Sequence, residues 1–115
     1  MIRIYHNNRC SKSRGALALL EQQGKPFEVV HYLETPPTIA ELKTLLSQLG
    51  IAARQLLRTG EDEYRQLKLD DPSLDEQTLI AAMSKHPRLI ERPIVVANGK
   101  AVIGRPPERV LDILS

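Results

Sequence analysis

The residues best suited to do chemistry in this sequence gather around its one cysteine, Cys10. Arg9, Lys12 and Arg14 place positive charge beside the thiol, and His6 adds to it when protonated. Such charge favours the thiolate, which is the nucleophilic form of cysteine. A free cysteine is more often a small buried hydrophobe, but here every neighbour from position 6 to 14 is polar or charged. The sequence therefore favours a reactive thiol at Cys10.

The cysteine lies where a predicted strand is followed by a predicted helix. Residues 2–5 alternate apolar and polar side chains, as a strand does, and residues 11–23 carry apolar residues at helical spacing. Gly24, with Pro26 after it, ends the helix. The first N–H groups of a helix are unpaired and its dipole is positive there, so this position stabilises a thiolate or a bound oxyanion.

Helical signals dominate the middle of the chain. A second strand over residues 27–33 completes a β-α-β unit with parallel strands. Capping boxes at residues 38–41 and 73–76 then predict helices that run to residues 49 and 85, the first closed by Gly50. Two shorter helical segments are predicted between them, over residues 51–57 and 64–69. We expect a single domain, residues 1–115, with a helical insertion at about 38–86.

The last third predicts a hairpin and a helix. Residues 94–97 and 100–103 are strand-like, and Asn98-Gly99 between them is the strongest short signal for an antiparallel hairpin. A helix is predicted over residues 107–114, with Val110, Leu111 and Leu114 on its buried side. The sum is an α/β layout, β-α-β followed after the insertion by β-β-α, which is that of a thioredoxin-like (glutaredoxin-like) domain.

Composition excludes several classes of protein. The net charge of +2 is too small to indicate nucleic-acid binding, and three Tyr and one Phe cannot form the stacking platform of single-strand binders. No window approaches the roughly 20 apolar residues of a membrane span, and no signal peptide precedes the first strand. One cysteine excludes an intramolecular disulfide. We expect a cytoplasmic protein with no membrane or nucleic-acid partner, no metal and no tightly bound cofactor.

Residues 6–14, HNNRCSKSR, resemble the H-N-P-x-C-x-x-S-R loop of the glutaredoxin-dependent arsenate reductases. Four further segments match that family at similar spacing: residues 32–38, 56–58, 92–96 and 105–106. Position 8 is Asn where the family has Pro, so we expect a less rigid loop.

The resemblance assigns roles to individual residues. It makes Cys10 the nucleophile and His6 a supporting residue of the catalytic loop, although a histidine at a strand end is equally well explained as a structural residue. Ser13 and Arg14 are further supporting residues, and Ser13 either donates a hydrogen bond to the sulfur or pairs with backbone in the first helical turn. Pro93 is expected to be a cis-proline facing the cysteine.

Three arginines are assigned by the resemblance to the oxyanion: Arg58, Arg92 and Arg105. Planar guanidinium groups suit tetrahedral oxyanions because they offer paired N–H donors. The remaining arginines of the last two thirds of the chain are interpreted as surface residues, namely Arg54, Arg65, Arg88 and Arg109.

The implied reaction is the reduction of arsenate to arsenite through a covalent thioarsenate on Cys10. With no second cysteine in the chain, an external thiol must complete the reduction. The resemblance names glutathione as that co-substrate and glutaredoxin as the partner that clears the mixed disulfide.

Two other classes of thiol enzyme lack a residue that they need in this sequence. A dithiol oxidoreductase needs Cys-x-x-Cys, but Ser13 stands at the second position, and a cysteine phosphatase needs an arginine where Ala16 stands. Redox-sensing regulators that bind RNA polymerase share the fold and the Arg-Pro-Ile segment, though several of them sense through Cys-x-x-Cys. A reductase of another glutathione-linked substrate also stays open, because fold does not fix the substrate.

Overall fold

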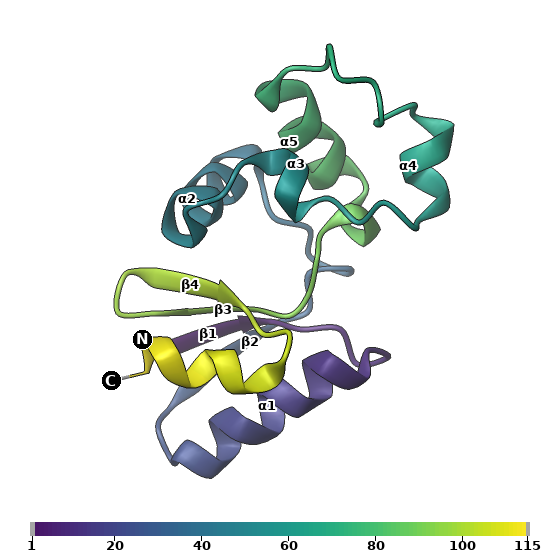
Figure 1. Cartoon of the computed structure of the whole chain (residues 1–115). Coiled ribbons are helices and arrows are strands. Elements are labelled where there is room, and N and C mark those ends of the chain that lie inside the picture. The colour runs from purple at the N-terminus through teal and green to yellow at the C-terminus, as the bar shows by residue number, and fades with distance from the viewer. Residues whose placement is uncertain (1, 115) are drawn as a thin grey trace. The chain divides into compact units, whose positions relative to one another are not determined.

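The computed structural model describes residues 2–114 and divides the chain into two compact units (Figure 1). The first contains the chain up to Thr35 and from Arg92 onward, and the second is Pro36–Glu91. The helical insertion expected at about 38–86 lies within the second unit. Each unit is described by itself below.

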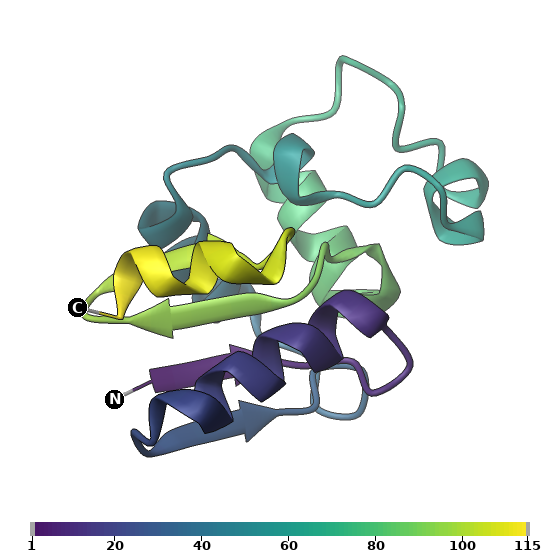
Figure 2. The same cartoon turned by 60° about the horizontal axis from the view of Figure 1, so that its bottom comes forward.

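The first unit is a four-stranded sheet with helices on one face. The strands stand in the order β2-β1-β3-β4, with β1 and β2 parallel and the other two pairings antiparallel. Figures 1 and 2 both show α1 and the 3-10 helix η2 on the same face of this sheet. The elements are β1 (Ile2–Tyr5), α1 (Ser11–Gln23), β2 (Phe27–Val30), β3 (Ile94–Ala97), β4 (Lys100–Ile103) and η2 (Pro107–Ile113). The predicted thioredoxin-like fold is confirmed.

The core of this unit lies between the sheet and the two helices. Apolar side chains of β1 and β3 meet those of α1 and η2, and the buried members are Ile2, Ile4, Ala16, Leu20, Val95, Ala97, Val110, Ile113 and Leu114. Burial of such side chains contributes about 1.5–3 kcal/mol each, so this cluster holds the helices on the sheet.

Residues with positive φ end helix α1 and form the hairpin turn at the positions that the sequence predicted. Gly24 ends α1 in the left-handed region with φ 69°, which glycine adopts without strain. Asn98 and Gly99 have φ 55° and 74°, so both central residues of the hairpin turn have the positive φ that this two-residue turn requires.

The second unit is helical. It contains α2 (Ile39–Leu49), α3 (Ala53–Leu56), α4 (Asp62–Gln66), α5 (Glu76–Lys85) and the 3-10 helix η1 (Pro87–Leu89). Thr38 caps α2 in the predicted capping box with Glu41, and Gly50 ends it with φ 70°. Helix α5 contacts α2, α3 and η1, so it is the centre of this unit. No helix within residues 2–114 combines the length and the apolar character needed to cross a membrane.

Two predicted boundaries are wrong for identifiable reasons. The strand predicted over residues 27–33 ends at Val30, because its one partner β1 ends at the paired residue Tyr5. Ser73 does not cap α5, since its N–H and hydroxyl both donate to the Asp71 carboxylate. The N-cap is Asp75, whose carboxylate accepts the N–H of residue 78 at 2.9 Å.

The shorter helices also differ in extent from the predicted ranges: α3 is shorter than residues 51–57, and α4 begins and ends earlier than residues 64–69.

The last helix was predicted with the wrong period. Pro107–Ile113 is a 3-10 helix, in which residues three apart lie on one face. Val110 and Ile113 therefore both point into the core, while Leu111, predicted to be buried, is 42% exposed. The predicted burial of Leu114 is confirmed.

Two leucine truncations should separate core from surface in this unit. Leu20→Ala deletes the same atoms as Leu111→Ala, but Leu20 is 1% exposed and belongs to the core cluster. We expect Leu20→Ala to lower the free energy of unfolding by about 2–5 kcal/mol, and Leu111→Ala by less than about 1 kcal/mol. Urea unfolding of both variants measures this, and equal losses would contradict the assigned core.

Candidate active site

Three segments singled out by the sequence leave the sheet at the same end. Tyr5, the last residue of β1, pairs with Ile94, the first of β3, and Ile94 pairs with Ile103, the last of β4. The cysteine loop follows Tyr5, Arg92-Pro93 precedes Ile94, and Arg105-Pro106 follows Ile103 after one residue. Neighbouring strands are about 4.8 Å apart, so the sheet brings the thiol loop and two of the three predicted oxyanion arginines to one end.

Cys10 is the N-cap residue of α1, which confirms its predicted place between strand and helix. Its N–H donates to the Asn7 carbonyl at 3.1 Å, and its carbonyl accepts the Arg14 N–H at 3.0 Å. The residue is 7% exposed, and its side chain does not cap the helix. The N–H groups of the first helical turn therefore stay available beside the sulfur, where they favour an anion.

A buried hydrogen bond fastens this loop to the helix. His6 Nδ1 and Ser13 Oγ lie 2.6 Å apart, and Ser13 Oγ also accepts the Asn7 N–H at 3.0 Å. His6 is 3% exposed and Ser13 is fully buried. Of the two partners proposed for Ser13 from the sequence, the structure shows neither: the hydroxyl joins the strand end and the loop instead of the sulfur or the first helical turn.

Burial lowers the pKa of His6 below its ordinary value, because desolvation disfavours the imidazolium. Interaction with the Asn8 side chain partly opposes this, and the positive charges of His31 and Arg14 lower the pKa further. The His6 and His31 rings meet edge to face with centroids 6.0 Å apart. His6 is therefore neutral at pH 7, and the expectation that it adds positive charge beside the thiol holds only in acid.

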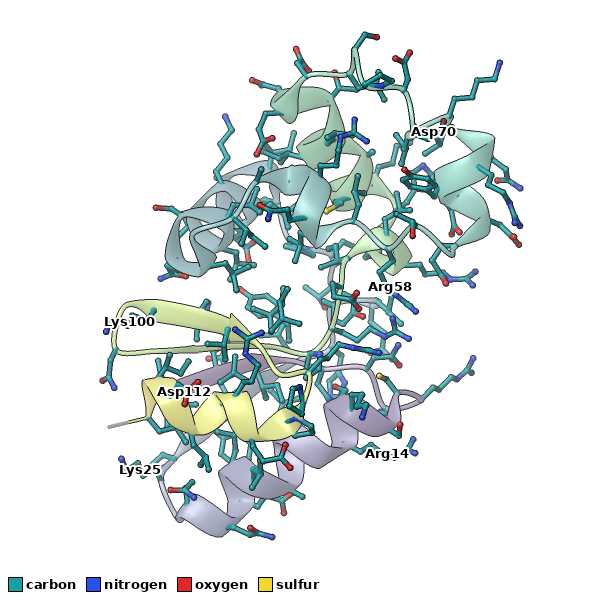
Figure 3. All side chains as sticks on the ribbon, viewed as in Figure 1. Arg14, Lys25, Arg58, Asp70, Lys100 and Asp112 are labelled. Atoms are coloured by element: carbon teal, nitrogen blue, oxygen red, sulfur yellow. The ribbon has the colours of Figure 1, made fainter. Side chains whose placement is uncertain are left out.

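Two hydrogen bonds are formed around position 8, where the family has Pro, and the lower rigidity expected of this loop stays a prediction. The Asn7 side-chain carbonyl accepts the Arg9 N–H at 3.0 Å, and Arg14 Nη1 donates to the Asn8 carbonyl at 2.9 Å. Figure 3 shows Arg14 near the start of α1, at the opposite end of the helix from Lys25. Both bonds hold the same peptide group, the one that joins Asn8 to Arg9.

The two arginine-proline pairs of this unit contact each other. Arg105 Nη1 donates to the Arg92 carbonyl at 3.4 Å, and the Gly104 N–H donates to the Pro93 carbonyl at 2.8 Å. The Arg92–Pro93 bond is cis, as predicted, and the Arg105–Pro106 bond is also cis, which was not predicted.

Gly104 lies at this site, although no pattern in the sequence singles it out. A Cβ at this position would lie 3.0 Å from Pro93 Cγ and 3.3 Å from Val110 Cγ2. These distances are tighter than ordinary van der Waals contacts, so a side chain at position 104 would push against the Pro93 ring and Val110. The one signal for Gly104 in the sequence was its place directly before Arg105.

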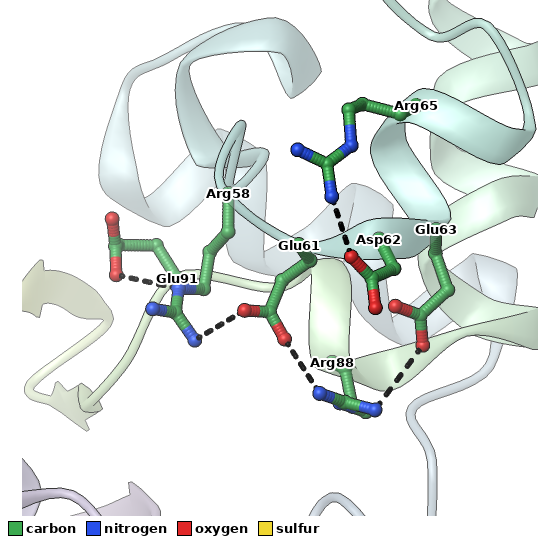
Figure 4. A network of polar contacts seen from close by, with 7 residues as sticks. All are labelled: Arg58, Glu61, Asp62, Glu63, Arg65, Arg88 and Glu91. Carbon is green, nitrogen blue, oxygen red and sulfur yellow. Dashed lines mark hydrogen bonds and ion pairs between the residues drawn. The ribbon is translucent and has the colours of Figure 1, made fainter.

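Arg58, the third predicted oxyanion ligand, belongs to the second unit. Its N–H donates to the Leu89 carbonyl at 2.8 Å, beside the antiparallel bridge between Leu57 and Ile90. Its guanidinium lies between two carboxylates, with Glu61 and Glu91 each at 3.7 Å (Figure 4).

The four arginines interpreted as surface residues differ from one another. Arg88 is 63% exposed but pairs with Glu61 at 3.2 Å and with Glu63 at 3.8 Å. Arg54 is half-buried and donates to two loop carbonyls, those of residues 69 and 71. Arg65 makes an exposed ion pair with Asp62, and Arg109 is exposed. Arg65 and Arg109 fit the interpretation, while Arg88 and Arg54 also hold neighbouring segments.

The arrangement at the end of the sheet suits an anionic substrate and a nucleophilic thiol. The N–H groups of the first turn of α1 and guanidinium groups such as those of Arg92 and Arg105 are chemically suited to neutralise an oxyanion, and a cysteine thiolate such as that of Cys10 is suited to attack. No cluster of three or more His, Cys, Asp or Glu side chains in the described part of the chain could hold a metal ion.

Comparison with known proteins supports this interpretation. Residues 5–113 match the ArsC family. An arsenate reductase of Neisseria meningitidis serogroup A is 54% identical over 114 residues, which cover 98% of this chain and 97% of that protein. Escherichia coli YfgD, named an uncharacterized protein, is 59% identical over 114 residues, 98% of this chain and 96% of that protein. The solved structure of an arsenate reductase from Vibrio cholerae is 55% identical, covers 98% of this chain and 97% of its own, and superposes with a TM-score of 0.96.

The lowered pKa of His6 predicts an acid-sensitive fold. Below about pH 6.5 the unfolded chain takes up a proton at this residue while the folded chain does not, so stability falls as the pH falls. In His6→Asn, an amide stands near the position of Nδ1, and this part of the pH dependence should disappear. Urea unfolding at about pH 7.5 and 5.5 tests it: an equal loss of stability in both proteins would contradict the buried neutral imidazole.

Proposed function

The chain belongs to the ArsC family, and we propose that it reduces arsenate to arsenite with Cys10 as the nucleophile. The observation that carries this proposal is the place of Cys10 at the N-cap of α1, at the same end of the sheet as Arg92 and Arg105. Relatives named arsenate reductase at 54% and 55% identity support the substrate.

In the first step the Cys10 thiolate attacks arsenic and an oxygen leaves as hydroxide or water, giving a thioarsenate. Arsenic keeps its oxidation state in this step, since an As–O bond is exchanged for an As–S bond. The guanidinium groups and the N–H groups of the first turn of α1 stabilise the charge that moves onto the arsenate oxygens.

The second step is the reduction. The thiolate of glutathione attacks the Cys10 sulfur, the S–As bond breaks, and its electron pair stays with arsenic, which leaves as arsenite. Two sulfurs lose one electron each and arsenic gains two, so the step balances with a mixed disulfide between Cys10 and glutathione as its other product. Glutaredoxin then takes the glutathione by thiol exchange and restores the Cys10 thiol. This chemistry suits the cytoplasm, where thiols are kept reduced.

Arg58 keeps its proposed role as a third ligand of the oxyanion on the strength of the family resemblance. The roles of His6, Ser13 and Arg14 are to hold the loop that carries Cys10, through the contacts described above.

A coupled assay tests the reaction directly. Arsenate, glutathione, glutaredoxin and glutathione reductase are combined with the protein, and NADPH consumption is followed. We expect arsenate-dependent consumption that requires Cys10 and every added component. No consumption above a protein-free control, together with normal glutathione adducts on Cys10, would favour a reductase of another glutathione-linked substrate.

Without glutaredoxin, turnover should stop at the mixed disulfide, because the chain contains no second cysteine that could resolve it. Intact-protein mass spectrometry after incubation with arsenate and glutathione should show one glutathione adduct. Dithiothreitol should remove the adduct, and Cys10→Ser should not form it. Arsenite production by Cys10→Ser would show that the nucleophile is another residue.

Arg92 should contribute through the geometry of its donors as well as its charge. Arg92→Lys keeps the charge and loses the paired N–H groups, so we expect kcat/KM for arsenate to fall about tenfold or more. This loss corresponds to the free energy that one charge-assisted hydrogen bond contributes in the transition state.

The matched control for this substitution is Arg109→Lys. Arg109 is an exposed arginine of the same unit, and the structure places no carboxylate of residues 2–114 at ion-pair distance from it. Arg88 is less suitable as a control, since it makes two ion pairs. Equal effects at positions 92 and 109 would mean that the guanidinium of Arg92 is not the ligand.

A further inference from the structure

The net charge of +2 is distributed unevenly between the two units. The first unit contains nine Lys and Arg against five Asp and Glu, a net charge of +4, and the second contains seven against nine, a net charge of −2. Three cations of the first unit, Arg9, Lys12 and Arg14, stand within six residues around Cys10, and all three are exposed. We call these three residues the loop cations.

The loop cations keep their positive charge unbalanced. Residues 1–20 contain no Asp or Glu. Within residues 2–114, no carboxylate from any other part of the chain lies at ion-pair distance from them either. Arg14 Nη1 donates to the Asn8 carbonyl, which is a neutral acceptor and leaves the charge in place. An anion that comes to the cysteine loop therefore meets three positive charges that no carboxylate offsets.

The second step of the proposed reaction brings two anions together at this loop, and the inference rests on that proposed function. The thiolate of glutathione carries two carboxylates and one ammonium group, so its net charge is about −2. The thioarsenate on Cys10 is an anion as well. Nearby positive charge lowers the free energy of such an encounter. Since Arg92 and Arg105 are proposed to hold the arsenate oxygens, the charge that attracts the incoming thiol must come from other residues.

We propose that Arg9 and Lys12 select the thiol that resolves the Cys10 adduct, and that they favour an anionic thiol of the glutathione type over neutral or cationic thiols. Arg9 directly precedes Cys10, and Lys12 is the second residue of α1. Consecutive Cα atoms are 3.8 Å apart, so both charges lie within roughly 10 Å of the sulfur, about one Debye length in 0.1 M salt. Arg14 is set apart from these two because its guanidinium also holds the loop.

Thiol–disulfide exchange measures this selection without arsenate. The Cys10 thiolate attacks one sulfur of a symmetrical disulfide, the S–S bond breaks, and its electron pair leaves with the other half as a thiolate. The Cys10 sulfur is oxidised and the leaving sulfur is reduced, so the step balances. With oxidised glutathione, this is the reverse of the attack by glutathione on a Cys10 disulfide, and both directions pass through the same transition state.

Two probes of opposite charge isolate the contribution of the cations. Oxidised glutathione has a net charge of about −2 at pH 7, and cystamine has a net charge of about +2. The rate constants of both are measured by quenching with an alkylating reagent and intact-protein mass spectrometry. A variant that changes the pKa or the exposure of the Cys10 thiol changes both rate constants alike. The ratio of the glutathione rate constant to the cystamine rate constant therefore reports the charge selection alone.

The double variant Arg9→Gln with Lys12→Gln should lower this ratio about fivefold or more in about 50 mM salt, because two positive charges near the thiol are lost. In about 1 M salt the Debye length is about 3 Å, so the ratio of the parent protein should fall toward that of the variant. A ratio that the double variant leaves unchanged would overturn the inference.

Lys100→Gln is the matched control for net charge. Lys100 is an exposed cation of the same unit and the first residue of β4, whose last residue, Ile103, lies at the end of the sheet where the cysteine loop begins. Figure 3 shows Lys100 far from Arg14 within this unit. Lys100→Gln should change the ratio by less than about twofold, since salt screens distant charges. An equal fall in this control and in the double variant would assign the effect to the overall charge and refute the proposal.

A charge-preserving variant completes the test. Arg9→Lys with Lys12→Arg keeps both charges and changes the donor geometry, so the ratio should stay within about twofold of the parent value. A fall as large as that of the double variant to Gln would show that specific hydrogen bonds, and not charge, make the selection, which contradicts the inference.

The exchange reaction also separates this inference from the proposed function. A protein that shows the charge selection and never reduces arsenate would refute the proposed function and leave the selection at Cys10 standing. A protein that reduces arsenate and exchanges with both disulfides without regard to their charge would refute the inference alone.

Discussion

The pairing of Ile4 with Val95 is the interaction on which the site in the first unit depends. Both side chains are fully buried in the core between the sheet and its helices. Because successive side chains of a strand point to opposite faces, a shift of one strand by one residue would turn its own buried side chains to the other face. The core therefore fixes the register, and the register places Tyr5 opposite Ile94 at the end of the sheet where the cysteine loop begins. The position of the thiol relative to Arg92 is thus determined by apolar contacts some residues away from it.

Elements specified by local chemistry could be predicted from the sequence. Asn98-Gly99 needs no tertiary contact to form its turn, and Gly24 ends α1 because of its own backbone freedom. The Thr38 capping box is likewise complete within four residues. Cys10 could be placed at the start of a helix for the same reason, since a strand pattern, a polar loop and a helical pattern follow one another directly.

Features that depend on contacts between distant or competing groups could not be predicted. Ser73 has the residue type of an N-cap, but the nearby Asp71 carboxylate takes both of its donors. Leu111 has the character of a core residue, and only the 3-10 period of η2 turns it outward. The carboxylate of Glu91 lies 3.7 Å from Arg58 because the segments that contain Leu57 and Ile90 pair as antiparallel neighbours. No local pattern in the sequence predicts that pairing.

The charge of an arginine therefore does not by itself define an anion site; its counter-ions decide how much of that charge a ligand meets. Within residues 2–114, no carboxylate lies at ion-pair distance from the Arg9, Lys12 and Arg14 side chains. Since His6 is neutral at pH 7, the field at the cysteine loop comes from these exposed cations and from the N-terminus of α1. Such a field is long-ranged, attracts any small anion and is screened by salt. Discrimination among anions must then come from contacts with fixed geometry, and this is the role that we propose for the guanidinium groups of the closely packed Arg92 and Arg105 segments.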